Sequence, residues 1–365
     1  MGLSYFNSTQ FQIAGTETFR LGSRKVLGVW GSNLQNVPKK LRALYRPKLG
    51  YKFVQTDQAG AEALIVAYLC KPGNYRQLFL NGINPHVFTA AHIFKDRWKE
   101  HIPVASLAKV LSTPIPEIPS LPEWKSVTKI IKSSDDWEPK MRYYFMGKKV
   151  GHAGNYDMRG PTFALDTLKE SEGAIVLDIE EANRLLEDRR RLFPEIPMWH
   201  YSIQELWSHY KGQPITLRNL FGFPRQFNDT PSDKTFKEAY AFIPQSTVGT
   251  ITNIAYTLMQ QYIEVCCNAY PKSSLHSKVV ESLDTFGSSR KAWDMLNNCH
   301  DSYLTQAPDE EAELCGRVQK FFIEQELTAP RGEKFRMKSE TQWGYNWAPY
   351  KADKNPQGLQ VLALN

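Results

Sequence analysis

The apolar positions change their period where one segment ends and the next begins. "YKFVQTD" (51–57) alternates as a half-buried strand does, and "AGAEALIVAYLC" (59–70) is dense in Ala and Leu, as a buried helix is. "NPHVFTAAHIF" (84–94) predicts a second helix, begun by Asn84 and Pro85, because Asn caps helices and Pro is preferred at their first position. The pattern therefore predicts a strand that leads into helices.

The rest of the chain mixes both kinds of element. Before residue 51 it is rich in Gly, Asn, Ser and basic residues, which favours loops and short strands. The later segments predict a Pro-rich surface insertion (100–137), a helical region (138–212), a hairpin (216–227) and a long helix (245–270). The expected fold class is α+β.

One isolated acid interrupts a strand-like stretch. Asp301 lies between His300 and Ser302 in "NNCHDSYLTQAPDEE" (297–311). An exposed turn residue is the ordinary interpretation. The alternative is a metal ligand on a β-hairpin, which requires a second acid elsewhere.

Asp57 is the candidate second acid, since it ends an apolar strand where a carboxylate is costly unless it meets a cation. It can equally be the N-cap of the following helix. Paired with Asp301, it predicts two hard oxygen ligands for Mg²⁺. Two such ions, roughly 3.5–4 Å apart, can activate a hydroxyl and stabilise a leaving pyrophosphate.

A third motif is "RYYFMGKKVGHAGNYDMRG" (142–160). Lys148, His152 and Tyr156 recur every four residues and so share one face of a helix, which suits a nucleoside triphosphate. The alternative is a Gly-rich loop, since each glycine disfavours a helix by roughly 1 kcal/mol. In a helix, these glycines would permit close approach to a base pair.

Composition narrows the class of protein. The 365 residues are 42% hydrophobic and 12% aromatic, which excludes disorder over most of the length. The net charge of +7 is compatible with a polyanionic partner. The five cysteines form no C-x-x-C motif, as in reduced intracellular proteins. The longest apolar run, "ALIVAYLC" (63–70), is too short to span a bilayer, so we expect a soluble protein with no membrane partner.

In this order, the three stretches resemble motifs A, B and C of the family A DNA polymerases. Asp57 and Glu62 stand as in "D-Y-S-Q-I-E-L-R", Lys148 and Tyr156 as in "K-x-x-x-F/Y-G-x-x-Y-G", and "HDS" as in "HDE". Flanking stretches agree, among them "TETFRLGS", "NLQNVP", "IPQSTVGTITNIA" and "WGYNWAPY". The resemblance covers nearly the whole chain. It implies a right-hand polymerase with an antiparallel palm sheet and inserted helical fingers.

The resemblance divides the chain into palm (1–82), fingers (83–205, with the insertion at about 100–137) and palm again (206–365). It implies a template-directed DNA polymerase that adds deoxynucleotides to a primer 3′ end and releases pyrophosphate. Its cofactor would be two Mg²⁺ ions, with Mn²⁺ as a substitute. Its partners would be primer–template DNA and deoxynucleoside triphosphates.

Residue roles follow from the same resemblance. Asp57 and Asp301 would hold the metals, helped by the carbonyl of Gln58, and Lys148 would bind the triphosphate and give a proton to the pyrophosphate. Glu62 and Tyr156 would exclude a sugar 2′-hydroxyl. The other implied nucleotide-binding residues are His86, Arg142 and His152, and the implied DNA-binding residues are Arg20, Asn33, Gln35, Lys237, Gln245 and His300.

The sequence departs from the family pattern at several positions. His152 replaces a Phe or Tyr beside the incoming sugar, Asp157 replaces a Gly, and Ser302 replaces a Glu. The Arg that binds the triphosphate in the family falls on Tyr144. Its candidate substitutes are Arg142 and Lys149.

Fewer than twenty residues precede "TETFRLGS", where the family has a helical thumb. We therefore expect a separate thumb or processivity subunit, and a location in the cytoplasm of a bacterium or a phage-infected host. Two alternatives stay open. Glu62 counts against a single-subunit RNA polymerase, whereas Asp157 and Ser302 support a catalytically silent, polymerase-like DNA-binding subunit.

Two further groups have ordinary explanations. Asp178 and Glu181 in "AIVLDIEEANRLL" predict a capping box that starts a helix, in preference to an exonuclease motif. The cluster Arg189, Arg190 and Arg191 predicts a solvated helix face, with template contact as the alternative.

Overall fold

The computed structural model describes residues 9–12, 16–24, 32–138, 140–210, 213–268 and 272–364. The chain forms two compact units. The sheet unit comprises residues 1–61, 218–223 and 245–365, and the helical unit comprises 62–217 and 224–244. These bounds differ from the expected segments 1–82, 83–205 and 206–365, which stay a prediction about palm and fingers.

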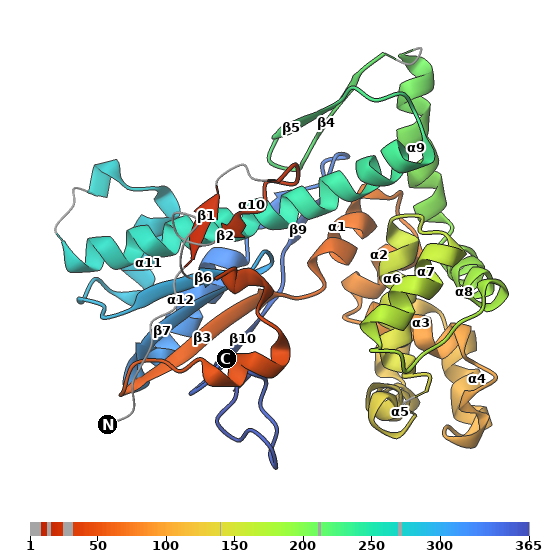
Figure 1. Ribbon diagram of the computed structural model, residues 1–365, viewed down its shortest axis with the longest axis horizontal. Helices are drawn as coiled ribbons and strands as arrows, with labels where there is room; N and C mark the ends of the chain where they lie inside the picture. Colours follow the sequence, from red (N-terminus) through yellow and green to blue (C-terminus); the bar gives the residue numbers. More distant parts are fainter. Residues whose placement is uncertain are drawn as a thin grey trace. The chain divides into compact units, whose positions relative to one another are not determined.

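The sheet unit contains most of the strands (Figure 1). Its elements are β1 (Gln10–Gln12), β2 (Gly22–Arg24), the 3-10 turns η1 (Leu34–Asn36) and η2 (Lys39–Leu44), β3 (Tyr51–Gln58), the later part of α10 (Asp233–Cys267), η5 (Lys272–Ser274), α11 (Ser277–Phe286), β6 (Asp294–Asn298), β7 (Ser302–Pro308), η6 (Asp309–Glu311), α12 (Ala312–Ile323), β8 (Glu326–Thr328), β9 (Lys334–Arg336), β10 (Ser339–Gly344) and β11 (Gln360–Val361).

The helical unit holds nearly all of the remaining elements. They are α1 (Ala61–Leu69), α2 (Asn74–Leu80), α3 (Pro85–Ile93), η3 (Trp98–Glu100), α4 (Val104–Ser112), η4 (Ile115–Ser120), α5 (Pro122–Trp137), α6 (Tyr143–Asn155), α7 (Gly160–Glu170), α8 (Ile179–Leu192), α9 (Glu195–His209), β4 (Ile215–Arg218), β5 (Pro224–Phe227) and the first part of α10. None of the described helices is long and apolar enough to cross a membrane.

The main sheet has five antiparallel strands in the order β11-β10-β3-β7-β6 (Figure 1). Strand β3 is the central strand, and side chains on both of its faces are buried. Val54 and Thr56 face α12, where the Val54 side chain lies close to Gly316. Phe53 on the opposite face packs with Leu304 in a second apolar cluster. The fold is therefore α+β with an antiparallel sheet, as the sequence predicts.

A buried amide fixes helix α12 on this sheet. The Gln319 side chain accepts a hydrogen bond from Thr56 Oγ1 (2.8 Å) and donates to Thr305 Oγ1 (2.8 Å). Its backbone carbonyl accepts from the Tyr303 hydroxyl (3.0 Å). All four residues are fully buried, so each of these polar groups needs its partner. The network joins β3, β7 and α12 in one register.

The helical unit has its own apolar core. An apolar cluster in its described part joins α3, α6 and α8 with the 100–137 stretch, which contributes Leu107, Val110, Val127 and Ile131. This stretch forms α4, η4 and α5, and one side of it is buried. It belongs to the helical core, because its apolar residues recur at helical spacing in spite of the prolines between the helices.

Most predicted elements are present at the expected places. Helix α3 begins with Asn84, which accepts hydrogen bonds from the backbone of His86 and Val87, and with Pro85 at its first position. Helix α8 is capped by Asp178, which accepts from Glu181 N–H (2.7 Å). The hairpin β4–β5 forms as predicted. Helix α10 begins at residue 233, earlier than expected.

The expected solvated arginine face is wrong for Arg189. This side chain is 1% exposed, donates a hydrogen bond to Asn155 Oδ1 (2.7 Å), and lies over the rings of Tyr75 and Phe193. Burial lowers the pKa of the Arg189 guanidinium below its usual value. The apolar positions around it in α8 bury this face of the helix, so a run of charged residues does not by itself predict a solvated face there.

The third motif (142–160) forms a helix, α6, in spite of its three glycines. The role that we expected for these glycines, close approach to a base pair, is wrong. A Cβ on Gly147 would overlap the His86 carbonyl oxygen and lie 2.9 Å from Ala90 Cβ. A Cβ on Gly154 would lie 2.8 Å from Arg189 Nη1. These glycines therefore permit close packing of α6 against α3 and α8, where we expected approach to a base pair.

We predict that Gly147→Ala destabilises the protein, although alanine is the better helix former by about 1 kcal/mol. Overpacking against the α3 backbone costs about 1–3 kcal/mol. The net loss should appear as a lower denaturant midpoint in equilibrium unfolding. Lys148→Ala, at an exposed neighbour on the same helix, is the control and should stay within about 0.5 kcal/mol of the wild type. A gain in stability of about 1 kcal/mol in Gly147→Ala, as helix propensity alone would give, would contradict the close approach.

Candidate active site

The register of β3 and β7 brings the two predicted acids to one end of the sheet. Asp57 is paired with Ser302, and the next amide, Gln58 N–H, donates to the Asp301 carbonyl (3.0 Å). Both acids are exposed, whereas Thr56 and Gln58 on either side of Asp57 are buried. Asp301 therefore lies in the β6–β7 turn beside the end of β3, as predicted.

The turn that carries Asp301 is tight. Cys299 N–H donates to the Ser302 carbonyl (2.7 Å) and Asp301 N–H to the Cys299 carbonyl (2.9 Å). His300 has φ 70°, in the left-handed region that histidine tolerates better than most residues. Burial raises the pKa of the Cys299 thiol to about 12, and the charges of Asp301 and Asp57 contribute to the rise. Both carboxylates are thus within electrostatic reach of one thiol.

Helix α10 supports this turn through a residue that sequence analysis missed. Thr252 Oγ1 donates to the His300 carbonyl (2.8 Å) and accepts from Gln58 Nε2 (2.7 Å). The Gln58 amide also donates to the Val248 carbonyl (3.1 Å). Thr252 thereby holds the ends of both acid-bearing segments. Nothing in a single sequence distinguishes this threonine from the others on α10.

The donor set at this end of the sheet fits magnesium. Among the described residues no cluster of three or more His, Cys, Asp or Glu side chains could hold a metal ion. Asp57 and Asp301 are two exposed carboxylates, and the backbone carbonyl of Gln58 is a third hard oxygen. Mg²⁺ is commonly bound by one or two carboxylates together with waters and substrate phosphates. A two-carboxylate site suits that mode of binding.

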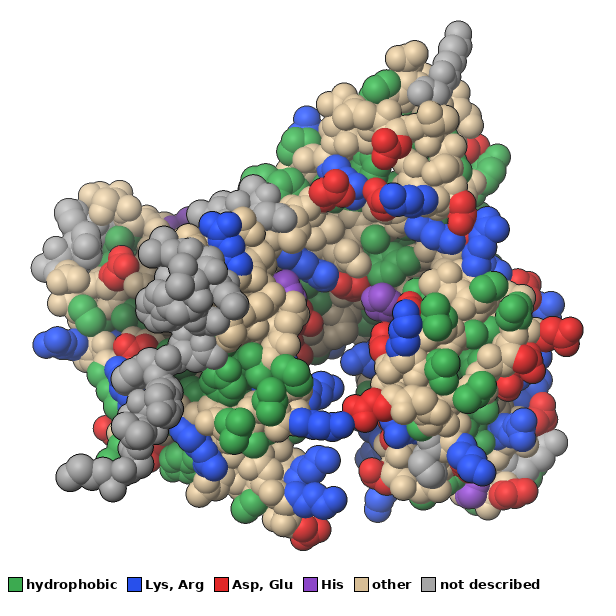
Figure 2. All heavy atoms as spheres, viewed as in Figure 1, with side chains coloured by type: hydrophobic (Ala, Val, Ile, Leu, Met, Phe, Trp, Pro, Cys, Tyr) green, Lys and Arg blue, Asp and Glu red, His purple; other side chains and the backbone are tan. Residues whose placement is uncertain are grey.

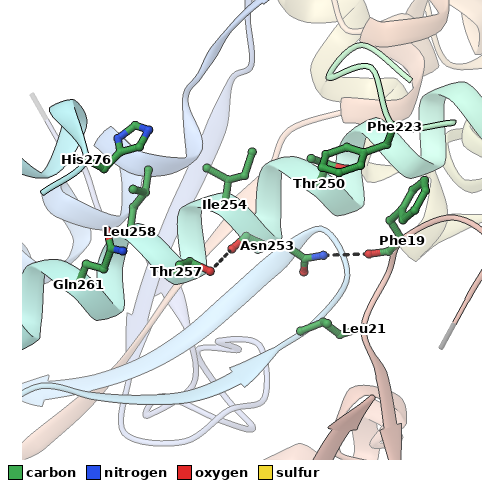
Figure 3. Close-up of a pocket in the computed structure, with 10 residues that line it drawn as sticks. All are labelled: Phe19, Leu21, Phe223, Thr250, Asn253, Ile254, Thr257, Leu258, Gln261 and His276. Carbon is green, nitrogen blue, oxygen red and sulfur yellow. Dashed lines mark hydrogen bonds between the residues drawn. The ribbon is translucent and has the colours of Figure 1, made fainter. Parts of the chain in front are cut away.

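Arg20 and His300, two of the predicted DNA-binding residues, belong to the same neighbourhood. Burial lowers the pKa of His300, and the positive charge of Arg20 lowers it further. Phe19 and Leu21, on either side of Arg20, line an apolar groove of about 510 Å³ along α10 (Figure 3). The groove residues are Phe19, Leu21, Phe223, Thr250, Asn253, Ile254, Thr257, Leu258, Gln261 and His276.

Asn253 fixes the backbone beside Arg20. Its side-chain amide donates to the Phe19 carbonyl (2.8 Å), as the dashed line in Figure 3 shows. Phe19 has φ 57°, which is unusual for a bulky residue, and its ring lies 5.4 Å from that of Phe223. The strained backbone is thus held by a hydrogen bond and a ring contact.

The other predicted DNA-binding residues lie in different parts of the chain and have different surroundings. Asn33 caps η1, and Gln35 is buried and donates to the Asn298 carbonyl (2.8 Å), so both stabilise the region of the turn. Gln245 is half-buried at the start of the sheet-unit part of α10. Lys237 belongs to the helical unit and pairs with Asp233 (2.7 Å). Their contact with DNA stays a prediction.

The helical unit places several of the predicted nucleotide-binding residues on α6 or next to it. Tyr156 donates a hydrogen bond to Glu62 Oε2, and His152 Nε2 lies 3.7 Å from the same oxygen. The rings of His152 and Tyr156 meet edge to face at 5.1 Å. Lys148 is exposed one turn before His152. The i, i+4, i+8 spacing has therefore placed a cation, an imidazole and a phenol together.

His86 adjoins this group from α3. A Cβ on Gly151 would lie 3.3 Å from His86 Nδ1, so the ring lies against α6. Burial lowers the pKa of His86 to about 4, and the positive charges of Lys148, Arg189 and His152 act in the same direction. His86 is consequently neutral near pH 7, and it can donate or accept a hydrogen bond there.

The two candidate substitutes for the missing arginine differ. Lys149 is buried and pairs with Glu170 (2.7 Å), which takes it away from the exposed face of α6. Arg142 is half-buried at the start of α6, with φ 45°. It stands six positions before Lys148, which is about 9 Å along a helix axis. Of the two, Arg142 is the better candidate.

The structure also explains two departures from the family pattern. Asp157 has φ 52°, a conformation that favours glycine, and its carboxylate pairs with Arg190 Nη2 (2.9 Å). Ser302 is buried, and its hydroxyl accepts from Gln55 Nε2 (3.2 Å). Each replacement is accommodated by a local partner.

Charge is evenly spread over the face of the helical unit that Figure 2 shows. Lys and Arg side chains alternate there with Asp and Glu over α2 to α8. The described residues on that face of the helical unit therefore form no single basic patch.

The fold is similar to that of a solved polymerase domain, as the resemblance in the sequence implies. A solved structure of "POL domain of Pol1 from M. smegmatis complex with DNA primer-template and dNTP" matches 93% of the chain with a TM-score of 0.58 and 16% identity. A curated DNA polymerase I of Treponema pallidum (strain Nichols) is 33% identical over 92 residues, which is 24% of the chain. The resemblance to the polymerase region of family A DNA polymerases is thereby confirmed.

These relatives are much longer than the matched parts. The chain spans 47% of the solved polymerase, and the aligned part is 9% of the curated one. No family model matches the chain.

Buried histidines should make the protein acid-sensitive. Burial lowers the pKa of both His86 and His200 to about 4. A folded-state pKa below the unfolded value gives stability that is present above about pH 6.5 and is lost as the pH falls toward the folded pKa, by up to about 3 kcal/mol for each group. Denaturant unfolding at a series of pH values measures the loss.

The contribution of His200 is separable from that of the carboxylates. His200→Gln should flatten the fall in unfolding free energy between about pH 6.5 and 4, because the titrating group is removed. His101→Gln, at an exposed histidine, is the control and should keep the wild-type slope. Equal slopes in all three proteins would show that His200 is not buried in its neutral form.

Proposed function

We propose that the chain is a template-directed DNA polymerase that adds deoxynucleotides to a primer 3′ end by two-metal phosphoryl transfer. The observation that supports this most directly is the pairing of Asp57 with Ser302, next to Asp301, at one end of the antiparallel sheet. The matched polymerase domain of M. smegmatis was solved in complex with a DNA primer–template and a deoxynucleotide, and we propose the same partners for this chain.

The carboxylates Asp57 and Asp301, with the Gln58 carbonyl, would hold two Mg²⁺ ions, for which Mn²⁺ would substitute. When bound, such ions lower the pKa of the attacking 3′-hydroxyl and neutralise charge on the departing pyrophosphate. The contribution of the chain is to fix the two carboxylates. It does so through the β3–β7 register and through Thr252, which joins Gln58 to the turn.

The α6 residues would bind the nucleotide. Lys148 is an exposed cation suited to the triphosphate and to protonating the pyrophosphate, and neutral His86 can hydrogen-bond a phosphate oxygen. Arg142 would supply a second cation. Glu62, held by the Tyr156 hydroxyl, would occupy the space beside the sugar 2′ carbon and so exclude ribonucleotides.

The DNA would be contacted by Arg20, Gln245 and His300 in the sheet unit, with Asn33 and Gln35 supporting the turn, and by Lys237. We also propose that a separate thumb or processivity subunit assists the grip on duplex DNA. Copurification with such a subunit, and a longer extension product per binding event in its presence, would support that part of the proposal.

Primer extension on a short template with Mg²⁺ tests the central proposal. Asp57→Ala and Asp301→Ala should each lower the rate of addition by about a thousandfold, since metal-based charge stabilisation is worth several kcal/mol. Chelation of divalent ions should abolish addition by the wild type.

The matched control for these variants is Asp353→Ala. Asp353 is exposed and follows the end of β10 farthest from Asp57, because Gly344 pairs with Phe53 and Glu340 with Asp57. It should retain the wild-type rate. Template-dictated addition that survives both Asp57→Ala and Asp301→Ala would refute the proposed site. Absence of addition by the wild type, with retained DNA binding, would favour a catalytically silent DNA-binding subunit.

A further inference from the structure

Glu62 has a second neighbour besides Tyr156, and it is one that the family pattern does not predict. His152 Nε2 lies 3.7 Å from Glu62 Oε2, the oxygen that accepts the Tyr156 hydrogen bond. A Phe or Tyr at position 152, as in the polymerases that the sequence resembles, would have no ionisable nitrogen there. The carboxylate is therefore flanked by a phenol and an imidazole.

We propose that His152 is a specificity-determining residue, which in its protonated form holds Glu62 against the sugar 2′ position and makes discrimination against ribonucleotides depend on pH. This inference rests on the proposed polymerase function, since it assigns His152 a role in choosing between two nucleotide sugars.

The geometry limits where the carboxylate can go. The edge-to-face contact with Tyr156, at 5.1 Å, orients the imidazole beside the same side chain that binds Glu62. A protonated His152 forms an ion pair with Glu62, so that both neighbours restrain one oxygen. A carboxylate restrained on two sides yields less readily to a 2′-hydroxyl. Loss of the proton removes the ion pair with His152 and leaves the hydrogen bond from Tyr156.

Solvent can reach the imidazole and so exchange its proton. The His152 side chain is 54% exposed, whereas that of Glu62 is 21% exposed. The charged groups that act on His152 are Glu62 from α1, Lys148 and Lys149 from α6, and Glu170 from α7, and His86 faces it from α3. Burial and the two lysines lower its pKa, whereas the two glutamates raise it. A bound triphosphate beside Lys148 would add negative charge and raise the pKa of His152.

The test compares incorporation of a deoxynucleotide and of the matching ribonucleotide from about pH 5.5 to about 8.5. The ratio of their kcat/KM values cancels pH effects on steps that the two nucleotides share. In the wild type, the preference for the deoxynucleotide should fall about two- to fivefold as the pH rises, as expected for a partly exposed ion pair. In His152→Phe the ratio should not change with pH. His101→Phe, at an exposed histidine of the same unit, is the matched control and should keep the wild-type profile.

A second measurement requires no polymerase activity. The pKa of His152, followed by NMR of labelled histidines, should fall in Glu62→Gln because the negative charge is lost. An unchanged pKa in that variant, or the same pH profile of the ratio in His152→Phe and the wild type, would overturn the proposal. Absence of all incorporation by the wild type would instead refute the proposed polymerase function and this specificity role with it, whereas the NMR titration would still decide whether the two side chains pair.

Discussion

The alignment of β3 with β7 is the constraint on which the rest of the candidate site depends. Side chains alternate between the faces of a sheet, so a shift of one residue in this pairing would place Asp57 on the α12 face. The buried Gln319 network opposes such a shift because it bonds Thr56 and Thr305 across the two strands. A hydrogen-bond network in the core thus fixes the position of two carboxylates on the surface.

The packing of α6 on α3 has the corresponding role in the helical unit. Gly147 and Gly151 allow the two helices to approach until His86 lies against α6. That approach helps to shield half-buried His86 from solvent, which lowers its pKa and keeps it neutral, and it is why His86 adjoins Lys148 and His152. Glycines lower the stability of α6 as an isolated helix. The same glycines allow α3 to pack closely on α6, and that packing places His86 beside Lys148 and His152.

Sequence patterns predict much of this fold, because the apolar period is strong where the elements are regular. Strand β3, helices α1 and α3, the β4–β5 hairpin and the Asp178 cap all follow from local signals. Arg189 could not be predicted, since its burial is set by Tyr75 and Phe193 from other elements. The bounds of the two units also depend on contacts between distant segments, as the short piece 218–223 shows.

Some residues of the candidate site can be predicted from the sequence, and others cannot. Residue types and order indicate Asp57, Asp301, Lys148 and Tyr156, because their chemistry restricts what can stand at those positions. The supporting residues do not have such a signature. In the sequence, Thr252 and Asn253 are ordinary polar residues on a long helix. Only the fold shows that Thr252 bonds the His300 carbonyl and that Asn253 bonds the Phe19 carbonyl. His152 belongs to both groups. Its identity is visible in the sequence as a departure from an aromatic position, but its relation to Glu62 depends on the turn of α6 that brings Nε2 to the carboxylate. The histidine that departs from the aromatic pattern in the sequence is, in the folded chain, a second ionisable side chain beside Glu62, the residue that we propose lies next to the sugar.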